Sequence, residues 1–152
     1  MKLQGKTAVV TGASSGMGRD IAYEYAREGA NVLAVARRAE RLQSLVDSAK
    51  DLPGRIAAFS ADLSEKSNVE GMIDEAIRQF GALDILVNNA GIMDDMSGIA
   101  DVSDEMFEKV LNINTKVPFY AMRKAVRHFL EAGGGVIVNI ASIGGLQGCR
   151  AG

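Results

Sequence analysis

The chain has 152 residues, 47% of them hydrophobic and 24% charged, and a formal net charge of -2 at pH 7. This size and composition fit a single globular domain over residues 1–152 with its own hydrophobic core, and they exclude a disordered chain. The charge offers no basic surface for nucleic acid or an anionic membrane, and no apolar run reaches the roughly 20 residues that a membrane span needs.

Cysteine and histidine are too scarce for a disulfide framework or a zinc site. Cys149 is the single cysteine and His128 the single histidine. One cysteine cannot form an internal disulfide and fits a reducing compartment, and one cysteine with one histidine cannot hold zinc. We therefore expect no metal site. Since residues 1–5 carry no signal-peptide pattern, we also expect a cytoplasmic protein.

The first half of the chain alternates short apolar runs with helical patterns. Residues 6–10 predict a buried strand, and a helical period follows until Gly29, which can end the helix. Residues 31–36 predict a second buried strand, with Arg37 and Arg38 directly after it. A second amphipathic helix follows these arginines.

The same alternation continues in the middle of the chain. Residues 55–60 predict a third strand, and Ser64 is expected to cap the next helix, which ends at Gly81. A fourth strand is predicted over 83–87, and it leads directly into the sequence Asn-Asn-Ala-Gly at 88–91.

The last third predicts one long helix and a fifth strand. Ser103 can cap a helix that extends over 104–130, and residues 136–141 form an apolar run that ends at Ser142. Strands that alternate with helices predict an α/β fold, a doubly wound parallel sheet of about five strands with helices on both faces.

Three glycines lie at the turn from the first strand into the first helix. Gly12, Gly16 and Gly18 leave room for a backbone to approach a phosphate, toward which the N–H groups of the helix can point. Such a triplet also fits a plain glycine-rich connection in another α/β protein. Whether the turn binds a ligand therefore has to be judged from the residues that follow the other predicted strands.

Polar or glycine-rich residues follow all five predicted strands at the same edge of the sheet. In a doubly wound sheet, ligands bind beyond the carboxyl ends of the strands. The residues at this edge are the glycine turn, Arg37-Arg38, Asp62-Leu63, Asn88-Asn89-Ala90-Gly91 and Ser142. Their number predicts one extended ligand rather than a small one.

The end of the second strand favours NADP(H) over NAD(H). A free ribose 2′-hydroxyl is usually bound by a carboxylate about 20 residues after the glycine turn, but this chain has Ala36, Arg37 and Arg38 there. Guanidinium groups bind a 2′-phosphate through charge-assisted hydrogen bonds. The alternative is that both arginines are only the solvated start of a helix.

Taken together, these motifs resemble those of the short-chain dehydrogenase/reductase family. The resemblance extends from Leu3 to Gly152 and is carried by Thr11-Gly12-x-x-x-Gly16-x-Gly18, Asp62-Leu63, Asn88-Asn89-Ala90-Gly91, Asn114 and the strand that ends in Ser142. It implies a Rossmann fold and hydride transfer between a nicotinamide cofactor and a small carbonyl or secondary-alcohol substrate.

The same resemblance assigns residues to parts of the cofactor. Asp62 and Leu63 would flank the adenine, and Asn88 would lie near the ribose on the nicotinamide side. The pyrophosphate and the adenosine ribose would be held by Gly12, Ser14, Ser15, Gly16, Met17 and Gly18.

Asn114 and Ser142 match two members of the family's catalytic group. The hydroxyl of Ser142 would bind the substrate oxygen, although a serine at a strand end can also simply satisfy the backbone. Pro118 lies four residues after Asn114 and has no N–H, so we expect a kinked helix and a free Asn114 carbonyl. Such a carbonyl can hold an ordered water, which in the family helps to pass protons to a lysine.

The family's tyrosine and lysine, in the pattern Tyr-x-x-x-Lys, are missing after Ser142. Tyr23, Tyr25 and Tyr120 precede Ser142 in predicted helices, and we interpret them as core or surface aromatics. The tyrosine would be the acid and base of the reaction, with its pKa lowered by the lysine. We therefore expect the chain to be the N-terminal portion of a longer protein, with its fifth strand left as an apolar edge.

Two functions from different classes remain open. The first is an NADP(H)-dependent oxidoreductase, which the family resemblance implies would form homo-oligomers through the long helix. The second is a catalytically inactive protein that binds or senses NADP(H) and lacks the tyrosine and the lysine.

Overall fold

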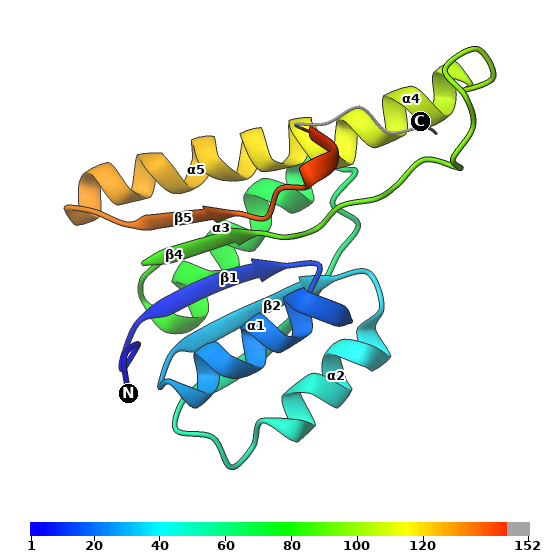
Figure 1. The fold of residues 1–152 in the computed structure, drawn as a ribbon. Coiled ribbons are helices and arrows are strands. Elements are labelled where there is room, and N and C mark those ends of the chain that lie inside the picture. The colour runs from blue at the N-terminus through cyan, green and yellow to red at the C-terminus, as the bar shows by residue number, and fades with distance from the viewer. Residues whose placement is uncertain (146–152) are drawn as a thin grey trace.

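The computed structural model describes residues 1–145 and contains one parallel sheet with helices on both faces (Figure 1). The strands are β1 (Thr7–Thr11), β2 (Asn31–Ala36), β3 (Arg55–Ser60), β4 (Ile85–Asn88) and β5 (Val136–Asn139). The helices are α1 (Gly16–Arg27), α2 (Ala39–Ser48), α3 (Lys66–Phe80), α4 (Asp104–Leu111) and α5 (Val117–Ala132), with a π-helical turn η1 (Asn112–Lys116) and a 3-10 turn η2 (Ile143–Gly145). The strand order β3-β2-β1-β4-β5, with parallel neighbours throughout, confirms the predicted doubly wound α/β fold.

The middle strand β1 is covered on both of its faces. All five of its residues are buried. Val9 belongs to the core beneath α3 and α5, whereas Ala8 and Val10 belong to the core beneath α1 and α2. Successive side chains of a strand point to opposite faces, so a continuous apolar run fills both cores at once. This packing fixes the carboxyl end of β1, where the glycine turn begins.

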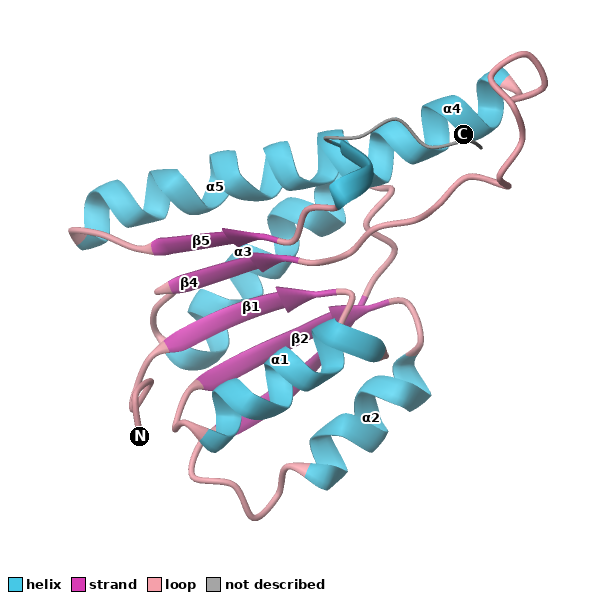
Figure 2. Ribbon diagram, viewed as in Figure 1, coloured by secondary structure: helices cyan, strands magenta, loops and turns pink. Residues whose placement is uncertain are grey.

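β5 is the edge strand that the sequence predicts. It pairs with β4, and no further strand of the described residues lies beyond it (Figure 2). Val136 at its start is 55% exposed. Apolar residues also remain exposed on the outer face of α5, at Phe119, Val126 and Leu130. The prediction of an uncovered apolar edge is therefore confirmed.

Three of the predicted helix termini are confirmed and one is wrong. Gly29, with a φ of 90°, directly follows the C-terminal cap of α1. The hydroxyl oxygen of Ser103 accepts a hydrogen bond from the backbone N–H of Met106 at 3.1 Å, and Gly81 ends α3 with a φ of 82°. Ser64, however, is not the cap of α3, because Glu65 precedes the helix and Ser64 lies in a turn. The carboxylate of Asp62 accepts the backbone N–H of Ser64 at 2.9 Å and so holds that turn.

The predicted single helix over 104–130 is interrupted by η1. The N–H of Val117 donates to the carbonyl of Asn112, which is the wider π-helical pattern. The Val117 N–H, the usual partner of the Ile113 carbonyl, is thus used by Asn112, and the Asn114 carbonyl has no partner four residues on because Pro118 has no N–H. The helix is thus interrupted where Pro118 predicts it, through a π-helical turn instead of a simple kink.

Among residues 1–145, no helix combines the length and apolar character that spanning a membrane requires.

Candidate functional site

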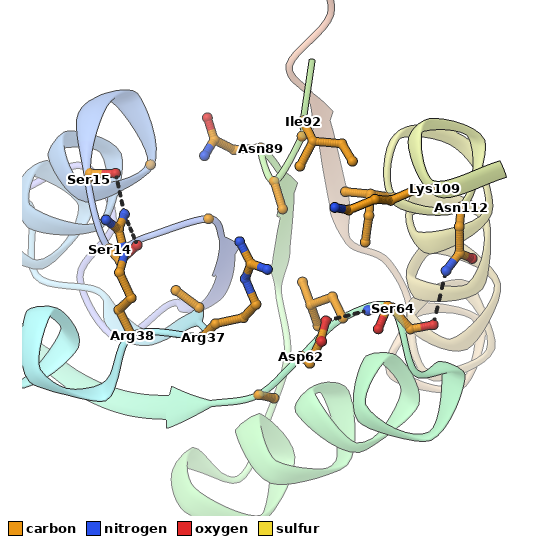
Figure 3. Close-up of a pocket in the computed structure, with 18 of the residues that line it drawn as sticks. Ser14, Ser15, Arg37, Arg38, Asp62, Ser64, Asn89, Ile92, Lys109 and Asn112 are labelled. Carbon is orange, nitrogen blue, oxygen red and sulfur yellow. Dashed lines mark hydrogen bonds between the residues drawn. The ribbon is translucent and has the colours of Figure 1, made fainter. Parts of the chain in front are cut away.

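A cavity of about 620 Å³ lies at the carboxyl edge of the sheet (Figure 3). The glycine turn, the β2–α2 connection, the β3–α3 connection and the residues after β4 all contribute to its lining. The structure brings together most of the residues that the sequence assigns to a cofactor. They are Gly12, Ser14, Ser15, Met17, Gly18, Arg37, Arg38, Asp62 and Leu63.

The glycines are required by how closely the turn packs on the end of β4. Gly12 has a φ of 70°, and a Cβ there would lie 2.8 Å from the side-chain nitrogen of Asn89. A Cβ on Gly18 would overlap the same side chain and the Gly12 carbonyl. A side chain at either position would therefore push the turn off its neighbour.

The start of α1 has the features of an anion-binding helix end. Its first turn carries no acidic residue, and the cap residue Ser15 makes no hydrogen bond from its side chain to the helix. A Cβ on Gly16, which has a φ of 54°, would meet nothing within 4 Å, so the space beside the turn is open. The N–H groups of this first turn are thus available to a phosphate, which fits a dinucleotide bound through its pyrophosphate.

A single threonine joins the ends of β1 and β4 beneath the cavity. The hydroxyl oxygen of Thr11 accepts the backbone N–H groups of Asn89 and Ala90, both at 3.0 Å, and its O–H donates to the carbonyl of Val87 at 3.3 Å. The side-chain amide of Asn89 donates back to the Thr11 carbonyl at 2.9 Å. These bonds fix the glycine turn relative to the residues after β4.

The two arginines after β2 have different surroundings. Arg38 donates from Nη2 to the hydroxyl oxygens of Ser14 and Ser15, each at 3.0 Å, whereas Arg37 points into the middle of the cavity (Figure 3). Within residues 1–145, neither guanidinium forms a salt bridge with a carboxylate. This edge of the cavity is therefore positively charged and open to an anionic group.

The opposite side of the cavity is formed by the β3–α3 turn and by α4. A hydrogen bond from the N–H of Ser64, assisted by the charge of Arg37, holds the pKa of the Asp62 carboxyl below its ordinary value. Asn112, the first residue of η1 after α4, donates to the carbonyl of Ser64 at 3.1 Å and so joins η1 to this turn. The ionised carboxylate of Asp62 remains a hydrogen-bond acceptor at neutral pH.

Other lining residues were not predicted from the sequence. Asn89 lies within the quoted Asn-Asn-Ala-Gly motif, so the motif contained the signal. The residues from the helical segment 104–116 are spaced by three and four, which places them on one helix face, but nothing in the sequence shows that this face meets the cavity. They are Met106, Lys109 and Ile113, together with Asn112, which directly precedes Ile113.

Asn114 and Ser142 lie outside the lining of this cavity. Asn114 makes two hydrogen bonds to Ile92, accepting its N–H at 2.9 Å and donating to its carbonyl at 2.8 Å. It thereby anchors the loop after β4. Ser142 is exposed after β5, and its hydroxyl oxygen accepts the N–H of Gly144 at 3.2 Å. The catalytic roles of both residues stay predictions.

Asn88 and Gly16 also lie outside the lining of the large cavity. Asn88 is only 5% exposed and donates to the side chain of Asn139 at 2.9 Å, while its own Oδ1 has no partner among the described residues. Gly16 borders a second, smaller cavity. The predicted contact of Asn88 with the cofactor ribose stays a prediction, and Asn89 takes its place in the lining.

One Tyr-x-x-x-Lys spacing does occur in the sequence before Ser142. Tyr120 and Lys124 are four residues apart on α5. Lys124 pairs with Asp74 of α3 at 2.7 Å, and the Tyr120 ring faces the charged groups of Lys66 and Arg123. Both side chains therefore join α5 to α3, which agrees with reading Tyr120 as a core or surface aromatic.

Comparison with known proteins gives consistent matches along the chain. The model of the family described as short chain dehydrogenase matches residues 6–152. The 3beta-hydroxysteroid dehydrogenase 2 of Eggerthella lenta is 42% identical over 151 residues, which are 99% of this chain and 58% of that protein. The cyclohexanol dehydrogenase of an Acinetobacter species is 37% identical over 149 residues, 98% of this chain and 59% of that protein.

One solved structure is also similar to nearly the whole of this chain. The crystal structure of an NAD+-bound xylitol dehydrogenase superposes with a TM-score of 0.92 at 30% identity, covering 98% of this chain and 57% of that one. The chain thus spans less than two thirds of the length of the relatives that it matches.

Proposed function

Because the chain belongs to the short-chain dehydrogenase family, we propose that it forms the cofactor-binding part of an oxidoreductase acting on a small carbonyl or secondary-alcohol substrate. The observation that carries this proposal is the cavity of about 620 Å³, which extends from the open first turn of α1 to Asp62 and the face of α4. A bound nicotinamide would supply or accept the hydride. The residues of this chain would bind and orient the dinucleotide.

NADP(H) is the proposed cofactor, with NAD(H) the weaker ligand. Ala36 ends β2 where a carboxylate would bind a free 2′-hydroxyl, and it is followed by two arginines without carboxylate partners in residues 1–145. Arg38 already lies within hydrogen-bond distance of two serine hydroxyls at the glycine turn. These groups together offer several donors to a 2′-phosphate.

The cofactor preference is tested by titrating the chain with NADPH and with NADH and following the nicotinamide fluorescence. The variants Arg37→Ala and Arg38→Ala should each weaken NADPH binding about tenfold, because each loses a charge-assisted hydrogen bond, and should change NADH binding little. Arg127→Ala is the matched control, since Arg127 is an exposed arginine on α5 outside the cavity. An NADPH:NADH affinity ratio that stays the same in both variants would refute the preference.

Asn114 and Ser142 are proposed to serve the substrate side of the reaction. Asn114 holds the loop after β4 through Ile92, and Ser142 would donate its hydroxyl hydrogen to the substrate oxygen. If the family's proton donor is supplied beyond this chain, Ser142→Ala in the longer protein should lower kcat while cofactor affinity stays unchanged. Loss of cofactor affinity alone would contradict this role.

A second candidate is a protein that binds NADP(H) without turnover. It is favoured by the observation that the single Tyr-x-x-x-Lys spacing in the sequence, Tyr120 with Lys124, is used in the contact between α5 and α3. NADPH consumption measured with a panel of ketones and aldehydes separates the two candidates. Saturable NADPH binding without consumption, by a protein whose intact mass is that of this chain, would support the second one.

A further inference from the structure

The carboxyl ends of β4 and β5 are joined by a pair of asparagine side chains. Asn88 and Asn139 are opposite each other in the parallel ladder and are the last paired residues of these two neighbouring strands (Figure 2). The side-chain amide of Asn88 donates to Oδ1 of Asn139 at 2.9 Å, and the N–H of Ile140 donates to the carbonyl of Asn88, also at 2.9 Å. Side-chain and backbone hydrogen bonds therefore connect the same two strand ends.

The side chain of Asn139 also contacts α5. Its nitrogen lies 3.6 Å from the sulfur of Met122, which is a weak acceptor. β5 has four residues and, within residues 1–145, pairs with a neighbour on one side alone. The side chain of Asn139 thus adds contacts to both β4 and α5 at the end of a short edge strand.

The asparagine pair has a cost at Asn88. This residue is only 5% exposed, and its Oδ1 is buried without a partner among the described residues. A buried acceptor without a partner is unfavourable, so its retention in a native structure calls for a reason. The orientation that leaves this oxygen unpaired is the one that directs the amide nitrogen of Asn88 to Asn139.

The asparagine pair lies between the two parts of the proposed reaction site. Asn89, the residue after Asn88, lines the cofactor cavity, and Ser142 follows Asn139 by three residues. The hydroxyl oxygen of Ser142 accepts the N–H of Gly144 at 3.2 Å, an arrangement in which the hydroxyl hydrogen can be donated to a substrate oxygen. A displacement of the end of β5 relative to β4 would therefore move Ser142 relative to the cofactor cavity.

We propose that Asn139 is a positioning residue for the reaction: its hydrogen bond with Asn88 fixes the hydroxyl of Ser142 relative to the cofactor cavity. This role depends on the proposed function, because Ser142 has to bind the substrate oxygen. Asn139 does not line the cavity and acts through Ser142. Its contribution to catalysis should therefore vanish when the hydroxyl of Ser142 is absent.

Amide hydrogen exchange in this chain tests the asparagine pair without any activity. Asn139→Ala removes the acceptor of the Asn88 amide and should speed exchange of the Ile140 N–H about tenfold, whereas Asn139→Asp keeps an acceptor oxygen and should retain slow exchange. Val136→Ala is the control for a general weakening of β5, because Val136 is exposed at the other end of the strand. Unchanged exchange in Asn139→Ala, or an equal increase in Val136→Ala, would overturn the proposal.

Steady-state kinetics of the longer protein then test the action through Ser142. Asn139→Ala should lower kcat about tenfold and leave the Kd for NADPH unchanged, while Asn139→Asp should retain most of the activity. In a Ser142→Ala background, Asn139→Ala should lower kcat no further, since no hydroxyl is left to position. Additive losses in the double variant would overturn the proposal, because Asn139 would then act independently of Ser142.

The activity of the wild-type longer protein separates this proposal from the proposed function. Absence of both NADPH binding and carbonyl turnover in the wild type would refute the proposed function, and the role of Asn139 in the reaction would fall with it. Normal wild-type turnover with an unchanged kcat in Asn139→Ala would refute the role of Asn139 alone.

Discussion

At the scale of single residues, Thr11 connects the two strand ends that form the floor of the cavity. Its hydroxyl group takes part in three hydrogen bonds to the backbone at the end of β4 and just after it. Thr11 is 1% exposed, so none of these bonds can be replaced by bulk water. The geometry of the glycine turn relative to β4 therefore depends on this hydroxyl group, together with the hydrogen bond from Asn89 to the Thr11 carbonyl.

Thr11→Val keeps the shape of the side chain and removes this hydroxyl. The N–H groups of Asn89 and Ala90 would lose their acceptor, so the free energy of unfolding should fall by about 1–3 kcal/mol. Urea unfolding measures the change. Thr115→Val serves as the control, because Thr115 is exposed on η1. Equal stability of the two variants would contradict the role given to Thr11.

The lowered pKa of Asp84 predicts that the free energy of unfolding depends on pH. Burial alone would raise its pKa, but the N–H of Thr7 at 2.8 Å and the ammonium group of Lys6 at 2.9 Å together hold the pKa of this carboxyl below its ordinary value. A lowered pKa in the folded state gives stability that is complete above the unfolded pKa, about 3.9, and is lost as the pH falls through the folded value.

Asp84→Asn should therefore cost about 1 kcal/mol of unfolding free energy at pH 7, with the difference from the wild-type chain shrinking below about pH 4. Urea unfolding over a series of pH values gives this comparison. A difference between the two proteins that stays constant down to acid pH would show that the carboxylate charge contributes nothing.

Motif residues could be predicted at this scale, and their neighbours could not. The glycines, Arg37 and Arg38 were predicted because only certain residue types allow a tight phosphate turn or bind a phosphate. Asn88 and Asn89 are the same residue type, so their roles depend on where β4 ends. The strand continues to Asn88, which turns that side chain toward Asn139 and leaves Asn89 for the cavity.

At the scale of elements, apolar runs located the strands well, whereas the helix ends depended on local hydrogen bonds. β2 and β3 have the predicted bounds. A continuous apolar run marks β2 as a buried parallel strand, whereas β3 lies at the sheet edge and most of its residues are exposed or half-buried. The start of α3 was missed because the carboxylate of Asp62 bonds the N–H of Ser64 and delays the helix. The π-helical turn η1 was missed because no residue pattern distinguishes it from a regular helix with a proline.

A substitution of Ser103 tests whether the first turn of α4, which contributes Met106 to the cavity, depends on its helix cap. Ser103→Ala removes the acceptor of the Met106 N–H and should destabilise the first turn of α4 by about 1 kcal/mol, whereas Ser103→Asp should retain the cap. Amide hydrogen exchange at residues 104–107 should become faster only in the alanine variant. Unchanged exchange there would mean that α4 is held by its packing alone.

At the scale of the whole molecule, the chain has a cavity along the carboxyl edge of its sheet and an open flank at β5 and α5. Cavity residues follow the buried strands β1, β2 and β4 and the edge strand β3, while β5 and the outer face of α5 leave apolar side chains exposed. This arrangement agrees with a chain that spans less than two thirds of the length of its relatives. We propose that a homo-oligomer formed through α5 covers part of this surface.

A substitution of Leu130 tests the proposed oligomer interface, because this side chain is 80% exposed on α5. Leu130→Glu introduces a charge that would be desolvated in an interface, and it should shift the molar mass in solution toward that of the monomer. Glu131→Gln, at the neighbouring exposed position, is the control. Light scattering after gel filtration gives the mass, and an identical mass for wild type and Leu130→Glu would exclude this face.

The central claim is that the cavity at the carboxyl edge binds a nicotinamide dinucleotide and prefers the one with a 2′-phosphate. Calorimetric titration of the unmodified chain with NADP+ and with NAD+ tests it most directly. We predict one site per chain for NADP+, with a Kd at least about tenfold lower than for NAD+, because a charge-assisted hydrogen bond to the 2′-phosphate is worth that factor. Absence of saturable binding for both dinucleotides, or tighter binding of NAD+, would contradict the claim.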